Sequence, residues 1–399
     1  MGFSQALSGL NAAATNLDVV GNNIANSQTV GFKSSSAQFA DVYAGAKVGL
    51  GTRVSAVLQD FSDGTLETTN RNLDLAVSGT GFFRMVQNDQ VVYSRNGQLT
   101  MTSDGYLENA QGARLTGYPA GVGAGGQPQT LQVPAGALMA TPTSEIDASL
   151  NLDASTAVIN RGTAAAPVTT FDATNPDTYS YANSATVYDS LGVAHNVTMY
   201  FTKIEDNKWE VRQSMDGAVD AANNGQLTFN ENGTLDVSAL NSFSFTPGGG
   251  AADLTYAIDF TGTTQFGNDF ELSSLNQNGY SSGRLVGIAI DEQGNIIGNY
   301  SNEQSQVLGS ITLANFRNPE GLQPIGDNAW TESSTSGQAL LGQGGSGVFG
   351  TIESGVVETS NVDLTAELVD LIIAQRNYQA NSQTIKVQDE VLQSAVNLR

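Results

Sequence analysis

The chain is 399 residues long and strongly acidic, with 16 Lys and Arg residues against 39 Asp and Glu residues and a formal net charge of −23. That length predicts two or three domains. The charge argues against nucleic acid and anionic lipid as partners, because few cations are present to pair with their phosphates. The chain has no cysteine, which excludes disulfides, thiol catalysis and cysteine-based metal sites.

The first predicted element is a helix from Ser4 to about Ala25. Its apolar residues follow one another at alternating steps of four and three, which keeps them on one side of a helix, as in a coiled coil. They are Phe3, Leu7, Leu10, Ala14, Leu17, Gly21 and Ile24. Gly31 breaks the pattern, and residues 31–70 are predicted to form an extended or hairpin-like stem.

From about Arg71 the sequence predicts strands joined by tight turns. Asn96-Gly97 and Asp104-Gly105 are strong hairpin signals, because the tight turns of hairpins need positive φ angles that Asn, Asp and Gly tolerate. A linker rich in Pro and Gly follows from Pro119 to about Asp147.

A second β region comes after the linker. Its predicted turns are Asp189–Gly192 and Asn232-Gly233. From Arg284 the pattern of the first β region returns, with a predicted turn at Gln293–Asn295.

The last predicted element is a helix that begins at the capping sequence Ser360–Asp363 and runs to Arg399. Apolar residues recur in it at every seventh position, with Leu368 and Val396 at two intervening positions. The seven-residue series is Leu364, Leu371, Tyr378, Ile385 and Leu392.

This order of elements predicts a multidomain fold in which terminal α-helices form a coiled-coil-like inner domain, with two nested mainly-β domains between them. The expected divisions are 1–30 and 360–399 for the inner helical domain, 31–70 for the stem, 71–144 and 285–359 for the inner β-domain, and 145–284 for the outer inserted β-domain.

An apolar stripe on a helix is most often the core-facing side of an ordinary domain. Here both stripes are terminal and neither has a nearby segment of matching pattern to cover it, so we expect copies of the chain to cover them. The predicted self-assembly seam consists of Phe3, Leu7, Leu10, Leu17, Ile24, Leu364, Leu368, Leu371, Tyr378, Ile385 and Leu392.

Three patterns suggest chemistry, and each has a simpler interpretation. Residues 342–347 spell G-x-G-x-x-G without the following helix that a dinucleotide site needs. His195 is the only histidine and cannot form a histidine cluster for a metal. The acidic pairs Glu205-Asp206 and Asp291-Glu292 adjoin turns and fit solvated surfaces better than a catalytic dyad. We therefore predict no catalytic, cofactor or metal site, and a protein that is not an enzyme.

The terminal segments closely resemble those of the bacterial flagellar axial proteins, the rod and hook family. The resemblance lies in Gly9–Asp18 (GLNAAATNLD), Gly21–Asn26 (GNNIAN) and Thr29–Lys33 (TVGFK), and at the other end in Ser360–Leu364 (SNVDL) and Gln375–Asn381 (QRNYQAN). It extends inward through Tyr93–Gly97, Leu115–Pro119 and Gly298–Glu303. The length and the inserted middle region are similar to those of the hook members, and the match is weakest over 145–280.

The resemblance implies a subunit of a tubular, extracellular polymer that passes motor torque from rod to filament as a flexible universal joint. It implies as partners further copies of the chain, the distal rod protein, the hook cap protein, the hook–filament junction protein and the flagellar type III export apparatus. No secretory signal precedes Lys33, and no apolar run is long enough for membrane insertion, which fits such export. Phe39 and Tyr43 match a candidate export element of the family, Phe-x-x-x-apolar.

Two other functions remain open on the sequence alone. A distal rod or hook–filament junction protein would share the same terminal segments. A carbohydrate-binding adhesin, or an unrecognised hydrolase, would instead use the β-domains.

Overall fold

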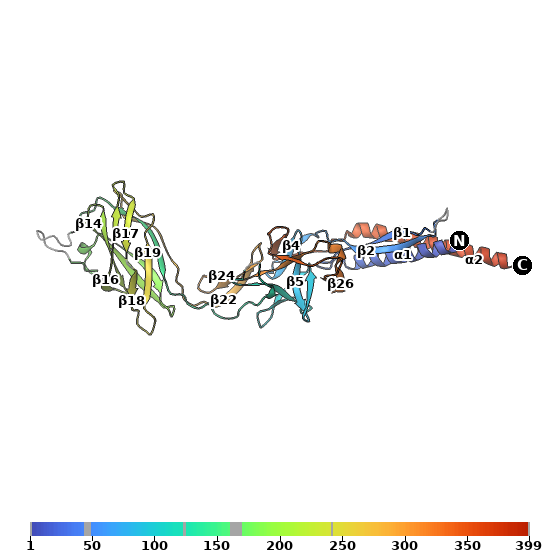
Figure 1. Cartoon of the computed structure of the whole chain (residues 1–399), viewed down its shortest axis with the longest axis horizontal. Helices are drawn as coiled ribbons and strands as arrows, with labels where there is room; N and C mark the ends of the chain where they lie inside the picture. The colour runs from blue at the N-terminus through green and yellow to red at the C-terminus, as the bar shows by residue number, and fades with distance from the viewer. Residues whose placement is uncertain (1, 44–48, 123–124, 160–169, 241, 398–399) are drawn as a thin grey trace. The chain divides into compact units, whose positions relative to one another are not determined.

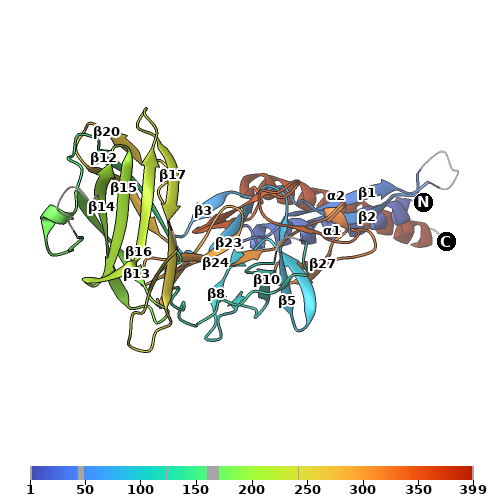
Figure 2. The same cartoon turned by 60° about the vertical axis from the view of Figure 1, so that its left-hand side comes forward.

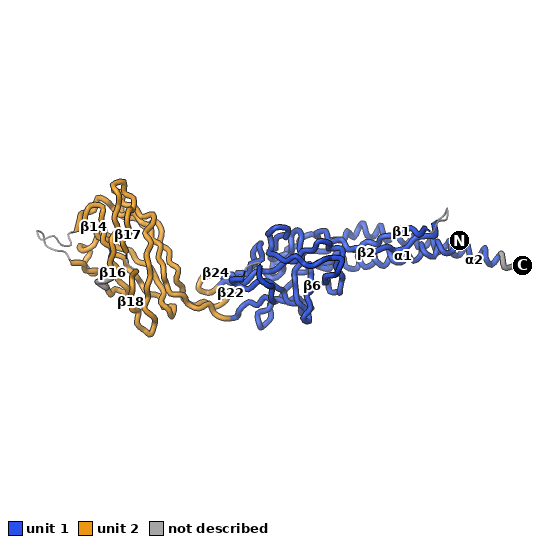
Figure 3. Tube along the Cα trace, in the orientation of Figure 1, with its two compact units in different colours: residues 1–135, 287–299, 305–399 blue, residues 136–286, 300–304 orange. Residues whose placement is uncertain are grey.

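The computed structural model describes residues 2–43, 49–122, 125–159, 170–240 and 242–397 (Figure 1). The chain divides into two compact units (Figure 3). Unit 1 comprises residues 1–135, 287–299 and 305–399, and unit 2 comprises residues 136–286 and 300–304. Unit 2 takes in the predicted outer domain, 145–284. The finer division of unit 1 into helical, stem and β parts stays a prediction.

The predicted fold class is confirmed, because an α-helix at each end flanks a large mainly-β body with several sheets. In unit 1, α1 (Gly2–Ala25) and α2 (Leu364–Asn397) lie side by side (Figures 1 and 2). β1 (Ser35–Asp41) and β2 (Thr52–Gln59) form an antiparallel hairpin that packs against α1. The segment predicted as a stem is therefore hairpin-like over these strands.

The start of α2 differs from the prediction. Asp363, rather than Ser360, caps the helix: its Oδ1 accepts hydrogen bonds from the N–H groups of Thr365 at 2.9 Å and Ala366 at 3.2 Å. The Ser360 hydroxyl instead accepts from the N–H of Val362 at 3.3 Å. Both residues have side chains that can cap a helix, so the sequence pattern alone did not distinguish them. The predicted helix end at Arg399 lies outside the described residues.

The β part of unit 1 contains one large sheet and two small ones. The large sheet follows the order β22-β23-β24-β10-β5-β6-β27-β26, with β8, β9, β11, β25 and β28 paired to it at the side. Its strands are β5 (Phe82–Gln87), β6 (Gln90–Ser94), β8 (Thr100–Met101), β9 (Leu107–Glu108), β10 (Arg114–Pro119), β11 (Gln129–Thr130), β22 (Leu285–Ile290), β23 (Asn295–Tyr300), β24 (Ser305–Ile311), β25 (Leu313–Asn315), β26 (Gln323–Gly326), β27 (Ala329–Thr331) and β28 (Leu340–Gly342).

The small sheets join segments from opposite ends of the chain. One orders β29 (Thr351–Ser354), β4 (Asp74–Ser78) and β7 (Gly97–Gln98), and the other pairs β3 (Leu66–Thr68) with β30 (Val356–Glu358). The short 3-10 helix η2 (Pro319–Gly321) precedes β26. Strands from before and after the insertion therefore complete the same sheets, as the nested order predicted.

The hairpin prediction at Asn96-Gly97 was wrong. β6 ends at Ser94 in the large sheet, and Gly97 opens β7 in a different sheet, so these residues form a bend between sheets. Gly97 is needed because a Cβ there would collide with the backbone carbonyl oxygen of Leu75. The predicted turn at Asp104-Gly105 is confirmed, since it joins β8 to β9 and Gly105 has φ +84°.

Unit 2 is a sandwich of two five-stranded sheets. One sheet contains β12 (Glu145–Asp153), β18 (Phe243–Phe245), β19 (Leu254–Asp259), β20 (Thr264–Phe266) and β21 (Glu271–Gln277). The other orders β13 (Tyr181–Tyr188), β14 (Ala194–Glu205), β15 (Lys208–Met215), β16 (Ala218–Phe229) and β17 (Leu235–Leu240). The 3-10 helix η1 (Pro176–Thr178) lies before β13. The turns predicted at Asp189–Gly192 and Asn232-Gly233 connect adjacent strands of the second sheet.

Alternating side chains from both sheets fill the space between them. β19 alternates buried and exposed residues along its whole length, which is typical of a strand with one face on a core. Phe201, Trp209 and Phe260 are fully buried in this core, and the Trp209 indole N–H donates to Oε1 of Gln265 at 2.6 Å. Unit 2 therefore has a hydrophobic core of its own.

We expect Phe201→Ala to destabilise unit 2 by about 3–5 kcal/mol, because it leaves a cavity between the sheets. The chain has two tryptophans, Trp209 in unit 2 and Trp330 in unit 1. In a Trp330→Phe background, urea unfolding followed by fluorescence therefore reports unit 2. Leu191→Ala, at an exposed turn residue, is the control. A loss below about 1 kcal/mol for Phe201→Ala would mean that the sheets do not depend on this packing.

Candidate assembly surface

The face of α1 that this chain covers is lined by small residues. Ala6, Ala13 and Val20 are buried at seven-residue spacing, and Asn23 is buried one turn after Val20. This buried series is shifted by one position from the predicted seam residue Leu7, which corresponds to about 100° around a helix. Leu7 and Phe3 therefore lie at the exposed edge of the helix, whereas Leu10, Leu17 and Ile24 flank the most buried face.

The structure brings together only part of the predicted seam. Leu371 and Ile385 are half-buried, as are Leu10, Leu17 and Ile24 on α1. The remaining members are exposed, and they are Phe3, Leu7, Leu364, Leu368, Tyr378 and Leu392. Ala374, which was not assigned to the seam, is buried on α2. The larger part of the seam is thus left uncovered by the chain itself.

Small side chains let the two helices approach closely. A Cβ at Gly9 would lie 2.7 Å from the side-chain oxygen of Asn381, so a larger residue there would force the Asn381 side chain to shift. A cavity of about 280 Å³ follows the helix pair and is lined by Ala12, Ala13 and Ala374 among others, with Phe39 from β1. The pairing of α1 with α2 thus uses small and amide residues and leaves most large apolar ones outside.

Asn23 connects three segments at the end of α1. Its Nδ2 donates to the carbonyl oxygen of Ser35 and to Oε1 of Glu367, both at 2.8 Å, and its Oδ1 accepts from the N–H of Ser35 at 3.0 Å. Burial raises the pKa of the Glu367 carboxyl, and the bond from Asn23 partly opposes that shift. One amide therefore holds α1, the stem and α2 in fixed register.

A buried ion-pair network lies where both helices meet the β part. Glu358 accepts from Nζ of Lys33 at 2.6 Å and pairs with Nη1 of Arg95 at 3.4 Å, and the Lys33 and Glu358 side chains are 0% exposed. Arg95 also reaches Asp63 at 3.2 Å. Burial lowers the pKa of Lys33, and its hydrogen bond to Glu358 opposes that shift. Residues far apart in the sequence meet at one carboxylate.

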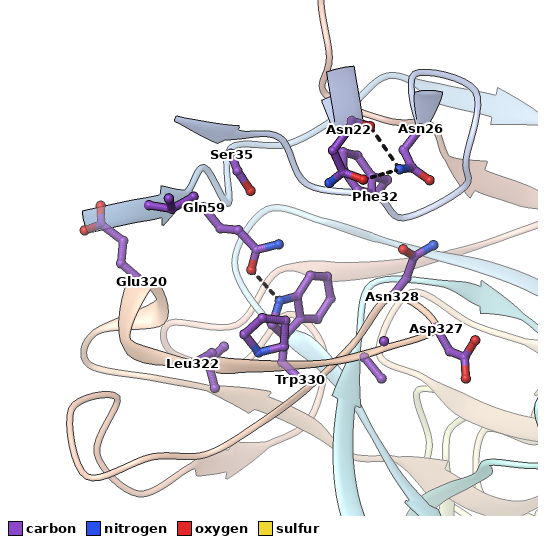
Figure 4. A pocket seen from close by; sticks show the side chains of 14 residues that line it. Asn22, Asn26, Phe32, Ser35, Gln59, Glu320, Leu322, Asp327, Asn328 and Trp330 are labelled. Atoms are coloured by element: carbon purple, nitrogen blue, oxygen red, sulfur yellow. Dashed lines mark hydrogen bonds between the residues drawn. The ribbon is translucent and has the colours of Figure 1, made fainter. Parts of the chain in front are cut away.

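A cavity of about 460 Å³ lies between the stem and the β part of unit 1 (Figure 4). Its wall includes the Trp330 indole, whose N–H donates to Oε1 of Gln59 at 2.6 Å. Nearby, Nδ2 of Asn328 donates to the carbonyl oxygen of Val30 at 3.0 Å. These two hydrogen bonds connect the stem to the β part of unit 1 at a place where apolar side chains do not pack closely.

The residues considered for chemistry occupy structural roles. Residues 342–347 lie in β28 and a turn, and no helix follows them directly, since α2 starts at Leu364. Glu205 forms an ion pair with Lys208 at 2.7 Å. Oδ1 of Asp291 accepts a hydrogen bond from the N–H of Asn295 at 2.7 Å, in the turn that leads into β23. Among the described residues, no group of three His, Cys, Asp or Glu side chains could hold a metal ion, and no helix could span a membrane.

His195 lies between two carboxylates on unit 2. Its Nδ1 is 2.7 Å from Oδ2 of Asp216, and its Nε2 is 3.3 Å from Oδ2 of Asp189. The hydrogen bond with Asp216 raises the pKa of His195 above its usual value. Asp189 also accepts the N–H groups of Leu191 and Val193, so this cluster fixes a turn.

Comparison with known proteins adds four matching family models. They are a flagella basal body rod protein model (residues 4–33), the flagellar hook protein FlgE/F/G D1 domain (76–159), the flagellar basal body protein FlaE D2 domain (151–280), and the flagellar basal body rod FlgEFG C-terminal model (353–398).

Among curated relatives, the flagellar hook protein FlgE of Escherichia coli is 48% identical, with 100% of both chains covered. That of Salmonella typhimurium is 47% identical, again with 100% of both chains covered, and that of Borreliella burgdorferi is 31% identical, with 98% of both covered. The crystal structure of Helicobacter pylori FlgE2 aligns with a TM-score of 0.55 at 15% identity, over 73% of this chain and 100% of that one, and supports the fold alone.

Rod-type segments at both ends of a nested β body define a flagellar axial protein. Within this class, the sequence identity to full-length hook proteins indicates a hook protein. The chain belongs to the flagellar hook protein FlgE family, whose members are structural components of the flagellum.

We expect Glu358→Ala to destabilise unit 1 by about 3–5 kcal/mol, because it leaves two buried cations without their shared carboxylate. Lys33→Ala should cost less, because Glu358 would keep Arg95 and the N–H of Gly64 as partners. Urea unfolding followed by Trp330 fluorescence in a Trp209→Phe background measures both. Equal costs for the two variants would contradict the central position of Glu358.

Unit 2 should lose stability as the pH rises through the raised pKa of His195. The imidazolium stabilises the folded state fully below the usual histidine pKa of about 6.5, and deprotonation removes this contribution. Thermal unfolding between about pH 5.5 and about pH 8 tests the effect, and His195→Gln should flatten the profile. His195 is the only histidine, so an unchanged profile in the variant would refute its role.

Proposed function

We propose that this chain is a structural, non-catalytic subunit that assembles with copies of itself into the tubular flagellar hook through its terminal helices. The observation that carries the proposal is the set of large apolar side chains left exposed on a helix pair that is already formed. They are Phe3 and Leu7 on α1, and Leu364, Leu368, Val369, Ile372, Ile373, Val387, Val391 and Leu392 on α2.

The size of this surface supports contacts with several neighbours. These side chains are between 42% and 62% exposed, and covering each would contribute roughly 1 kcal/mol. Together they supply on the order of 10 kcal/mol, which is similar to the cost of about 4–15 kcal/mol for fixing one copy onto another. A dimer that uses a fraction of this surface is therefore weak, whereas a copy held by several neighbours is stable.

A hook has to bend while it rotates, so its subunits must slide against their neighbours during each turn. Two separately compact units support this role, because contacts between copies made by unit 1 and by unit 2 can change independently. The polymer then acts as a universal joint, with the helical parts transmitting torque.

We further propose that the chain is exported through the flagellar type III apparatus and assembles outside the cell, bounded by the distal rod, hook cap and hook–filament junction proteins. Family membership supports this proposal. Phe39 and Tyr43, the candidate export element, are 44% and 69% exposed. Full-length identity to hook proteins favours the hook over the rod or junction alternatives, and no observation favours an adhesin.

We expect Ile373→Asp to abolish polymerisation, because a carboxylate would have to be buried against a neighbouring copy. Since Ile373 is half exposed in the single chain, the free energy of unfolding should change by less than about 1 kcal/mol. Electron microscopy and sedimentation of concentrated protein measure tube formation. Gln379→Asp, at an exposed polar position of the same helix, is the matched control and should still polymerise. Normal tubes from Ile373→Asp would place the interface elsewhere.

A further inference from the structure

The two terminal helices pair in antiparallel register and differ in length. Asn23 bonds Glu367, and Gly9 contacts Asn381, so the segment 9–23 of α1 runs alongside the segment 367–381 of α2. This register places Gly2, the first residue of α1, level with residue 388. Residues 389–397 of α2 therefore extend beyond α1, as Figure 1 also shows.

Exposed apolar residues gather at the two ends of this helix pair. The tip patch, at the end with the overhang, consists of Phe3, Leu7, Val387, Val391 and Leu392. The base patch, at the start of α2, consists of Leu364, Leu368, Val369, Ile372 and Ile373. Between them, residues 375–386 expose mainly polar side chains, with Tyr378 and Ala380 as the exceptions. The helix pair thus carries two separate apolar surfaces.

The two patches repeat the same pattern along α2. Val387, Val391 and Leu392 stand at positions i, i+4 and i+5. The same spacing occurs in the base patch at Leu364, Leu368 and Val369, and again at Leu368, Ile372 and Ile373. Two parallel α2 helices therefore bring matching apolar positions side by side in two registers, with Val387 of one copy level with either Leu364 or Leu368 of the other.

We propose that the tip patch of one copy docks on the base patch of a second copy, head to tail. This inference rests on the proposed function, because it takes another copy of the chain as the partner. A tip-to-tip contact would close a two-fold dimer and leave both base patches uncovered. The head-to-tail contact covers both patches and is heterologous, so it builds an open helical polymer when the rotation between successive copies does not close a ring.

The overhang explains why the tip patch is free to dock. Its residues lie past the end of α1, so a second copy can reach Val391 and Leu392 without displacing the chain's own helix pair. The two registers correspond to axial offsets of about 35 Å and about 28 Å between neighbouring helix pairs, because an α-helix rises about 1.5 Å per residue.

Cysteine cross-linking tests this contact, since the chain has no cysteine of its own. Two double variants, Leu368→Cys with Val391→Cys and Ile372→Cys with Val391→Cys, represent the two registers. After assembly and mild oxidation, we expect at least one of them to give a ladder of disulfide-linked multimers on a denaturing gel. Formation of the bond requires Cα atoms within about 7 Å of each other.

Single variants and a shifted pair are the controls. Val391→Cys alone should stay monomeric on the gel, and Gln379→Cys with Val391→Cys should give no ladder. Should a double variant not form tubes, the two single variants are co-assembled with unmodified chain, and a disulfide dimer of one copy of each is expected.

The outcomes separate the two proposals. Disulfide dimers from Val391→Cys alone would establish a tip-to-tip contact and overturn the inference, as would tubes in which neither pair of cysteines links. Failure of the unmodified chain to form tubes would instead refute the proposed function, on which the inference depends.

Discussion

The structure of unit 1 depends on one buried carboxylate, that of Glu358. It joins Lys33, which follows α1, to Arg95 in the β part, and it lies shortly before α2 begins. A buried charge is tolerated only when its partners are in place, so the three segments must meet in a single geometry. That geometry fixes where both terminal helices leave the β body, and hence which faces they can turn toward each other.

The contact between α1 and α2 differs from a typical helix–helix contact in a globular protein. Alanine, glycine and asparagine occupy much of the contact between α1 and α2, while most of the leucine, isoleucine and valine side chains of α2 stay exposed. A globular protein would bury the larger residues first, because each contributes more free energy on burial. The arrangement is understandable when the stable state is an assembly, in which neighbouring copies cover those residues.

Several features could be read from the sequence because their causes are local. The periodic apolar residues predicted both helices. The turns around Gly192 and Gly233 were predicted from residue types that accept positive φ. Asn96-Gly97 carried an equally strong local signal, yet the backbone of Leu75 turns it into a bend between sheets. At the start of α2, Ser360 and Asp363 were both suitable caps, and the structure uses Asp363.

By itself, the sequence determined the fold class, the nested order of segments and the presence of terminal helices with apolar stripes. Periodicity and turn chemistry are properties of neighbouring residues, so one chain suffices to show them. The tertiary structure decided which face of each stripe the chain covers for itself, and it brought Lys33, Arg95 and Glu358 together. Those facts depend on contacts between opposite ends of the chain, as between Lys33 and Glu358, and no local pattern records such contacts.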